Sequence, residues 1–290
     1  MDRPDTSPPT MMQRILASDF VFDFTRAPLA MLAAAVVLFL FIIAILAPLV
    51  APTNPFDPAS LNLMNGFTPP MTPNMFTGQS FVMGADDQGR DLLSAIIYGL
   101  RVSLFVGVMS VLLAMGIGVS LGLVAGYVGG WLDNLIMRIA DIQLTFPSIL
   151  IAMLIFGVLR GIIPPDLRDE MAIFVLIAAI GLSEWVPFAR TVRATTLVEK
   201  EKEYVQAAKL IGLWRGQIMW RHILPNVIGP VLVIATITLA LAIIAEATLS
   251  FLGVGAPPTE PSLGTLIRIG QDYLFSVCLL YTSPSPRDPR

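Results

Sequence analysis

A short polar elbow reads Glu203-Tyr-Val-Gln-Ala-Ala-Lys-Leu-Ile-Gly212 and continues, nine residues later, as His222-Ile-Leu-Pro225-Asn226. It lies between two long apolar stretches, and its first half is predicted to form a short helix with small side chains at Ala207 and Ala208. Gly212 is expected to end this helix, because a residue without Cβ accepts the left-handed turn that helix ends often need. Pro225 is expected to force a break before the next apolar run. A charged helical segment this ordered is more than a connecting loop needs.

The composition identifies an integral membrane protein. Of its 290 residues, 55% are hydrophobic and 13% are charged, whereas soluble domains carry about 25% charged residues. The net charge of −3 is uninformative for a membrane protein, and no segment is basic enough to indicate nucleic-acid binding. With one cysteine (Cys278) and one histidine (His222), a disulfide or a Cys/His metal site within the chain is excluded. Residues 1–28 lack the basic start and immediate apolar core of a cleavable signal peptide, so the first apolar span is expected to be retained.

Five apolar stretches are long enough to cross a bilayer, for which a helix needs about 20 residues. They are Leu29–Val50, Val102–Tyr127, Ile139–Leu159, Met171–Ala189 and Val227–Leu252. The second is rich in glycine, which suits close helix packing in lipid, and Pro147 interrupts the third. The predicted fold class is therefore all-α, a polytopic bundle of membrane helices with its membrane domain over residues 29–275.

The basic residues predict which loops face the cytoplasm. Residues 190–221 hold seven of the eighteen basic residues, including every lysine. The long segment 51–99 holds only Arg90 against four aspartates. The elbow region 190–226 is therefore predicted to be cytoplasmic and residues 51–99 extracytoplasmic. Counting spans backwards predicts that the N-terminal segment 1–28 is cytoplasmic too.

No catalytic machinery is predicted. No lysine follows a glycine, so the chain has no Gly-x-x-x-x-Gly-Lys-Ser/Thr loop and should not hydrolyse ATP. It offers neither a Ser/His/Asp set nor a cluster of metal ligands. A solute passage, a receptor or a scaffold remains, and the energy for transport must come from an ion gradient or a partner.

Acidic residues within the predicted spans are few, which argues against an ion-coupled carrier. Asp141 lies near one end of the third span and is predicted to pair with Arg138, one turn away. Glu184 lies in the fourth span and Glu246 in the fifth. Both glutamates are candidates for lining a pathway or a gate. The favoured interpretation of Glu246 is structural, a bond to a neighbouring helix or to backbone, because such a bond offsets the same burial cost.

The elbow resembles the EAA loop of permease subunits of ABC importers. Gln206 stands where the leading glutamate is usual, and His222 where an aliphatic residue is usual. Further blocks resemble the C-type permease of dipeptide and oligopeptide importers over about 23–275: Met83–Ser94, Tyr98–Ser103, Arg138–Asp141 with Phe146-Pro147, Arg190 with Arg193, and Glu246–Gly255. For the outer block, Met83–Ser94, a folded loop tied by Asp86, Arg90 and Asp91 is favoured over direct contact with substrate, because outside loops first need internal hydrogen bonds.

The resemblance implies a type I importer fold in which this chain forms half of a translocation pathway in the inner or plasma membrane of a prokaryote. It implies four kinds of partner: a second permease, two cytoplasmic ATPase subunits, an extracytoplasmic binding protein and the lipid bilayer. ATP would be bound by the partners, so no cofactor is expected in this chain. The elbow would dock on the ATPase through Glu203, Tyr204, Gln206, Ala207, Ala208, Gly212 and Pro225. On this hypothesis Ala208→Trp abolishes uptake and leaves membrane insertion intact.

The last residues depart from the family, whose members have a sixth span. Residues 276–290 are polar and rich in proline, and they are predicted to be a non-native tail that forms no membrane helix. The resemblance does not choose between peptides and other small solutes such as nickel. Two alternatives of other classes stay open: an ion-coupled carrier or channel that works without an ATPase, and a non-transporting scaffold or receptor.

Overall fold

The computed structural model describes residues 26–57, 62–74, 76–257 and 260–282. Its α-helices are α3 (Pro28–Ile45), α4 (Ala47–Val50), α5 (Leu92–Val128), α6 (Gly130–Leu144), α7 (Ser148–Ile162), α8 (Arg168–Ser183), α9 (Trp185–Glu199), α10 (Glu203–Leu210), α11 (Arg215–Ile218), α12 (Leu224–Phe251) and α13 (Leu263–Thr282). Two short 3₁₀ turns, Leu63–Asn65 and Pro165–Leu167, and a π-helical turn, Met219–Ile223, complete the regular structure. These ranges contain no strand, which confirms the all-α prediction.

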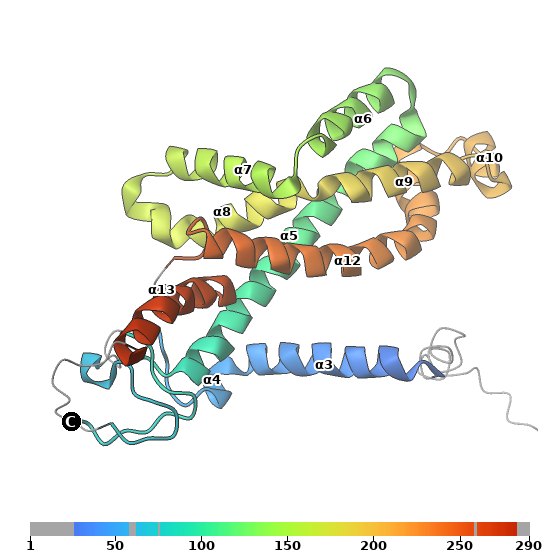
Figure 1. The fold of residues 1–290 in the computed structure, drawn as a ribbon. Helices are drawn as coiled ribbons and strands as arrows, with labels where there is room; N and C mark the ends of the chain where they lie inside the picture. The colour runs from blue at the N-terminus through green and yellow to red at the C-terminus, as the bar shows by residue number, and fades with distance from the viewer. Residues whose placement is uncertain (1–25, 58–61, 75, 258–259, 283–290) are drawn as a thin grey trace, which may run out of the picture.

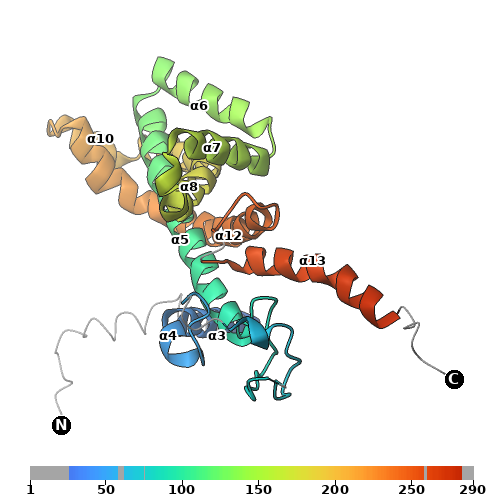
Figure 2. The same cartoon turned by 90° about the vertical axis from the view of Figure 1, so that its left-hand side faces the viewer.

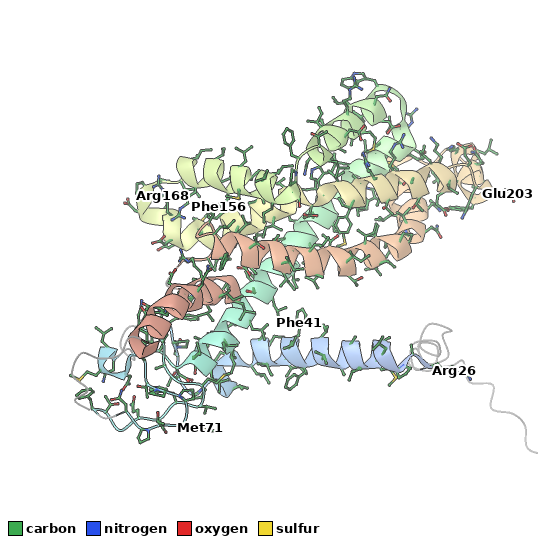
Figure 3. All side chains as sticks on the ribbon, in the orientation of Figure 1. Arg26, Phe41, Met71, Phe156, Arg168 and Glu203 are labelled. Carbon is green, nitrogen blue, oxygen red and sulfur yellow. The ribbon has the colours of Figure 1, made fainter. Side chains whose placement is uncertain are left out.

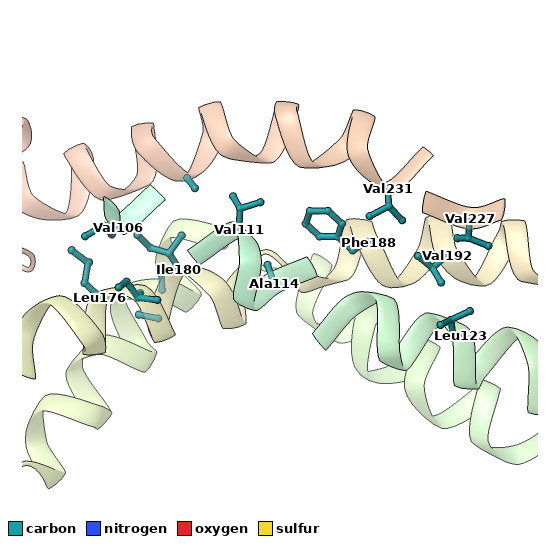
Figure 4. Close-up of a cluster of buried hydrophobic side chains, with 14 of the residues drawn as sticks. Val106, Val111, Ala114, Leu123, Leu176, Ile180, Phe188, Val192, Val227 and Val231 are labelled. Carbon is teal, nitrogen blue, oxygen red and sulfur yellow. The ribbon is translucent and has the colours of Figure 1, made fainter. Parts of the chain in front are cut away.

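The central element is α5, a 37-residue helix around which α8, α9 and α12 pack (Figure 1). Its glycines allow α9 to approach closely: a Cβ on Gly122 would lie 2.5 Å from the Ala189 carbonyl oxygen, and one on Gly118 equally close to that of Trp185. Phe188 and Val192 of α9 join Val111 and Leu123 of α5 in the main apolar core (Figure 4). The glycine-rich span thus forms the predicted close packing.

Helix α3 is equally apolar but stands apart from this bundle. It extends away from the first turns of α5 (Figure 1), and Ala44 is its one buried residue. Among the described residues, three helices are long and apolar enough to cross a membrane: Pro28–Ile45, Leu92–Val128 and the continuous helix Arg215–Phe251. The count reaches five if two bent pairs are each taken as one span.

Two of the predicted spans are bent, including the third, where an interruption at Pro147 was expected. α6 and α7 meet at 99° within the predicted third span, Ile139–Leu159. Pro147 explains this break, because it precedes α7 and disfavours helical backbone in the residue before it. α8 and α9 meet at 41° around Glu184. Here Pro187 follows in the first turn of α9, where its ring crowds the carbonyl four residues earlier.

Pro225 does not break the chain as predicted. It lies in the first turn of α12, and the helix runs on from Arg215 to Phe251. The π-helical turn lies directly before it, where the Leu224 N–H bonds to the Met219 carbonyl five residues back. This shift of the hydrogen-bond register allows the helix to pass through Pro225, which has no N–H to donate, so the expected break at this proline does not occur.

The C-terminal prediction excluded a membrane helix, and the structure does not contradict it. α13 continues to Thr282 and so includes 276–282, but it is not among the described helices that are long and apolar enough to cross a membrane. The helix can continue into this region because its first proline is Pro284. Residues 283–290 of the predicted tail, and 1–25 of the predicted cytoplasmic segment, lie outside the described residues.

The segment between α4 and α5 is a folded loop, as expected. Both Asp86 oxygens are used: Oδ2 accepts from Arg90 Nε at 2.9 Å, and Oδ1 accepts from the backbone N–H groups of Gln88 and Arg90. Asp91 Oδ2 accepts from the Ser94 backbone N–H and caps α5. The predicted ties through Asp86, Arg90 and Asp91 are confirmed.

Candidate functional site

The elbow between α9 and α12 carries the candidate site, and α10 is its exposed helix (Figure 3). Gly212 ends α10 as predicted, with a φ of +82° that a side chain would strain. Two backbone bonds close the end: Gly212 N–H to the Lys209 carbonyl at 3.0 Å and Leu213 N–H to the Ala208 carbonyl at 3.2 Å. This is a Schellman turn, which fixes where the chain leaves the helix.

Tyr204 joins α10 to two membrane helices. Its hydroxyl donates to Glu199 Oε2 in α9 at 2.6 Å and accepts from Asn226 Nδ2 in α12 at 3.1 Å. Glu199 Oε1 accepts from Lys202 Nζ at 2.7 Å, and the Glu199 side chain is 8% exposed. Burial, together with the bond to Glu199, raises the pKa of Tyr204 to about 12, so the hydroxyl stays protonated and able to donate.

A second set of bonds ties the elbow to α5. Lys200 Nζ donates to the Gly126 carbonyl in the last turns of α5 at 3.1 Å. Gln206 Nε2 donates to the Lys200 carbonyl at 3.2 Å, so Gln206 is engaged within the chain. α10 is therefore held to α5, α9 and α12 together, and a displacement of α10 would strain bonds to all three.

The structure divides the predicted docking residues into buried and exposed ones. Ala208 is 4% exposed and belongs, with Val205, to the same apolar cluster as Ile218. The prediction that Ala208 lies on an open face is therefore wrong, because the chain returns through α11 and covers it. Ala207, Glu203 and Pro225 are exposed, as is Gly212.

Three apolar residues of the elbow that the structure shows to be exposed were not singled out from the sequence. Leu210 is 89% exposed, Ile211 77% and Trp214 77%, and they surround the Gly212 turn. Large apolar side chains at a charged turn are an available signal, since a monomeric surface gains nothing from exposing three of them side by side. This cluster, Leu210, Ile211 and Trp214, is called the apex below.

Two arginines of α9 pair with aspartates of α6. Arg193 makes two bonds to the Asp133 carboxylate, of 2.5 and 2.7 Å. Arg190 pairs with Asp141. Asp141 was predicted to pair with Arg138 on its own helix, and this is wrong: packing between helices brings a residue 49 positions away into reach.

The two intramembrane glutamates lie apart. Glu246 in α12 is fully buried; its Oε1 accepts from Ser250 Oγ at 2.7 Å, while Oε2 has no hydrogen-bond partner among the described residues. Its observed bond is thus to its own helix rather than to a neighbouring one. Glu184 is half-buried and lies within the predicted fourth span, at the bend between α8 and α9.

Long apolar helices packed around α5 and joined by a polar elbow are the arrangement of a polytopic membrane protein. Residues 118–285 match the family model of the binding-protein-dependent transport system inner membrane component. Residues 16–70 match the N-terminal TM domain of oligopeptide transport permease C. The chain belongs to this family of inner membrane transport components, and it is a permease subunit of an ABC importer.

Named relatives agree along most of the chain. The dipeptide transport system permease protein DppC of Haemophilus influenzae is 35% identical over 280 residues, covering 96% of this chain and 90% of the relative. The oligopeptide transport system permease protein OppC of Bacillus subtilis is 34% identical, covering 88% of this chain and 77% of the relative. The dipeptide transport system permease protein DppC of Alkalihalophilus pseudofirmus is 37% identical, covering 81% of this chain and 71% of the relative.

Proposed function

We propose that this permease carries dipeptides or oligopeptides and that its apex is the surface on which a cytoplasmic ATPase docks. The relatives are named for dipeptide or oligopeptide transport, which supports the cargo. The single observation that carries the docking surface is the exposure of Leu210, Ile211 and Trp214 on an elbow held by hydrogen bonds. Apolar side chains on a rigid support are what a partner's groove can bind at low entropic cost.

The complete transporter would hold a second permease, two ATPase subunits that bind ATP, and an extracytoplasmic binding protein. The elbow would face the cytoplasm, together with the N-terminal segment, because residues 190–221 concentrate the basic residues. The ATPases can shift the permease between inward-open and outward-open states only if they bind these states differently. Docking on the apex would provide that bias, since the elbow is bonded to α5, α9 and α12.

A matched pair of substitutions tests the docking surface in the assembled transporter. Ile211→Asn changes the apex, and Ile162→Asn makes the same change at the end of α7 on a side chain of similar exposure, 77% against 75%. Ile211→Asn should weaken ATPase copurification and peptide uptake about tenfold or more, as for a central interface contact. Ile162→Asn should leave ATPase copurification unchanged. Equal copurification by both variants would remove the docking surface.

The same preparation separates the ATP-driven importer from an ion-coupled carrier. Proteoliposomes with the complete transporter should take up labelled dipeptide only when ATP is present on the elbow side. Uptake that persists without the ATPase subunits and collapses with an ion gradient would assign the chain to the carrier class.

A further inference from the structure

A cavity of about 410 Å³ lies between the end of α5 and the turn from α10 to α11. Tyr127 and Val128 contribute from α5, and Leu213 and Ile218 form apolar parts of the wall. Lys209 and Arg215 supply its charge. Figures 1 and 2 both place α10 beside the end of α5 where α6 begins. None of the lining residues is acidic, so the cavity is electrostatically suited to an anion.

Lys209 and Arg215 differ from Lys200 and Lys202 of the same elbow in having no partner among the described residues. Lys200 bonds to the Gly126 carbonyl and Lys202 to Glu199, so both are used within the chain. Lys209 and Arg215 make no ion pair or side-chain hydrogen bond to any described residue. The nearby carboxylates of Asp133 and Glu199 are already occupied by Arg193 and Lys202.

The predicted topology places the cavity on the cytoplasmic side, because it lies at the elbow, where the basic residues are concentrated. α5 is about 55 Å long at about 1.5 Å per residue, so it must extend beyond a hydrocarbon layer of about 30 Å. Trp131, three residues after the end of α5, is 74% exposed, as expected for an aromatic side chain at the interface. The half-buried Leu213 beside the two cations suits a lipid headgroup, with glycerol carbons against Leu213 and the phosphate against the cations.

We propose that this cavity binds the phosphate of an anionic phospholipid headgroup, held by Lys209, Arg215 and the Tyr127 hydroxyl. Basic pockets between membrane helices are known to bind anionic headgroups. Guanidinium and ammonium groups make short, strong hydrogen bonds to phosphate oxygens. Because Lys209 lies on α10 and Tyr127 on α5, a bound phosphate would add one more link between the elbow and the central helix. This site is independent of the peptide cargo.

The test titrates the assembled transporter in detergent with short-chain phosphatidylglycerol, phosphatidylcholine or inorganic phosphate and counts bound molecules by native mass spectrometry. Lys209→Gln and Arg215→Gln should each weaken phosphatidylglycerol binding about fivefold, the contribution of one cation near a membrane surface. Arg221→Gln is the matched control: it removes an exposed cation of the same elbow that does not line the cavity, and it should change binding less than twofold.

Five outcomes decide the proposal. Preference for phosphatidylglycerol, lost in the two cavity variants only, supports it. If inorganic phosphate binds as tightly as phosphatidylglycerol and loses affinity in the same two variants, the cavity is an anion site for free phosphate rather than for a lipid. Equal losses in all three variants, or equal binding of phosphatidylcholine, overturn it. Loss of ATPase subunits with unchanged lipid binding also overturns it and assigns the two cations to the ATPase interface.

Discussion

The seam between α5 and α9 and the elbow from Glu199 to Asn226 are held together in opposite ways. At the seam, glycines such as Gly118 and Gly122 bring backbone against backbone, and the large side chains point into the core. In the elbow, hydrogen bonds through Tyr204 and Lys200 fix the helix while the apex faces outward. The seam gives the permease a rigid body, and the elbow gives it a rigid surface to present.

The difference teaches where substitutions should damage folding and where they should damage coupling. In the seam there is no space for an added atom, so changes act on stability. In the elbow, the side chains that stabilise the fold differ from those that are exposed to a partner, and the two kinds can be neighbours in the sequence. Ala207 and Ala208 are adjacent, yet the first is exposed and the second is buried.

The largest effect is expected from Ala208→Trp. The side chain would be forced into the cluster formed with Val205 and Ile218 and should lower the free energy of unfolding by about 3 kcal/mol or more. Ala207→Trp, one residue away and exposed, should leave the thermal midpoint within about 1 °C. Thermal unfolding of the purified permease measures both. Equal midpoints for the two variants would restore the earlier hypothesis that Ala208 faces a partner.

Next comes Gly122→Ala in the seam. The new Cβ would lie 2.5 Å from the Ala189 carbonyl oxygen, and the resulting displacement of α9 should cost about 2 kcal/mol. Gly116→Ala is the matched control in the same helix, because its Cβ would meet no atom within 4 Å apart from the surrounding turns of α5 itself. It should stabilise the protein slightly, by about 0.8 kcal/mol, through helix propensity. Opposite signs confirm the seam; two stabilised variants contradict it.

A smaller effect is expected from Tyr204→Phe. The substitution removes the bonds to Glu199 and Asn226 but retains the ring, so it should cost about 1 kcal/mol. ATP hydrolysis by the assembled transporter should continue while uptake per ATP falls, because α10 is then less firmly bonded to α9 and α12. If uptake and hydrolysis fall together, the hydroxyl acts on folding alone.

The smallest effect concerns pH. Tyr204 has a pKa raised to about 12, from an ordinary value near 10. A group with a raised pKa in the folded state stabilises fully below its unfolded value and loses that contribution as the pH rises through the folded value. The Tyr204 bonds should therefore be constant between pH 6 and pH 9. A midpoint difference between wild type and Tyr204→Phe that changes across this range would contradict the assignment of the hydroxyl as a donor.

Local chemistry in the sequence predicts some of these features and not others. The turn at Gly212 follows from the residue itself, as does the loop tied by Asp86 and Arg90. Which alanine of α10 is buried depends on how α11 returns, and a single segment does not reveal this. The pairing of Asp141 with Arg190 depends likewise on the packing of α6 beside α9. Rules based on local sequence fail where contacts with distant segments determine the structure. Pro225 is a different case: the adjacent π-helical turn allows the helix to continue through a proline that was expected to break it.

The π-turn at Met219–Ile223 also sets the angular phase of α12. One additional residue in a helical turn rotates everything after it by about 100° relative to an uninterrupted helix. The side of α12 that points inward, including the fully buried Glu246, is therefore fixed by a single residue near its start. Removing that residue would rotate Glu246 out of the interior unless the elbow itself turned. The length of this short segment thus couples the direction of the apex to the face that α12 presents to α5.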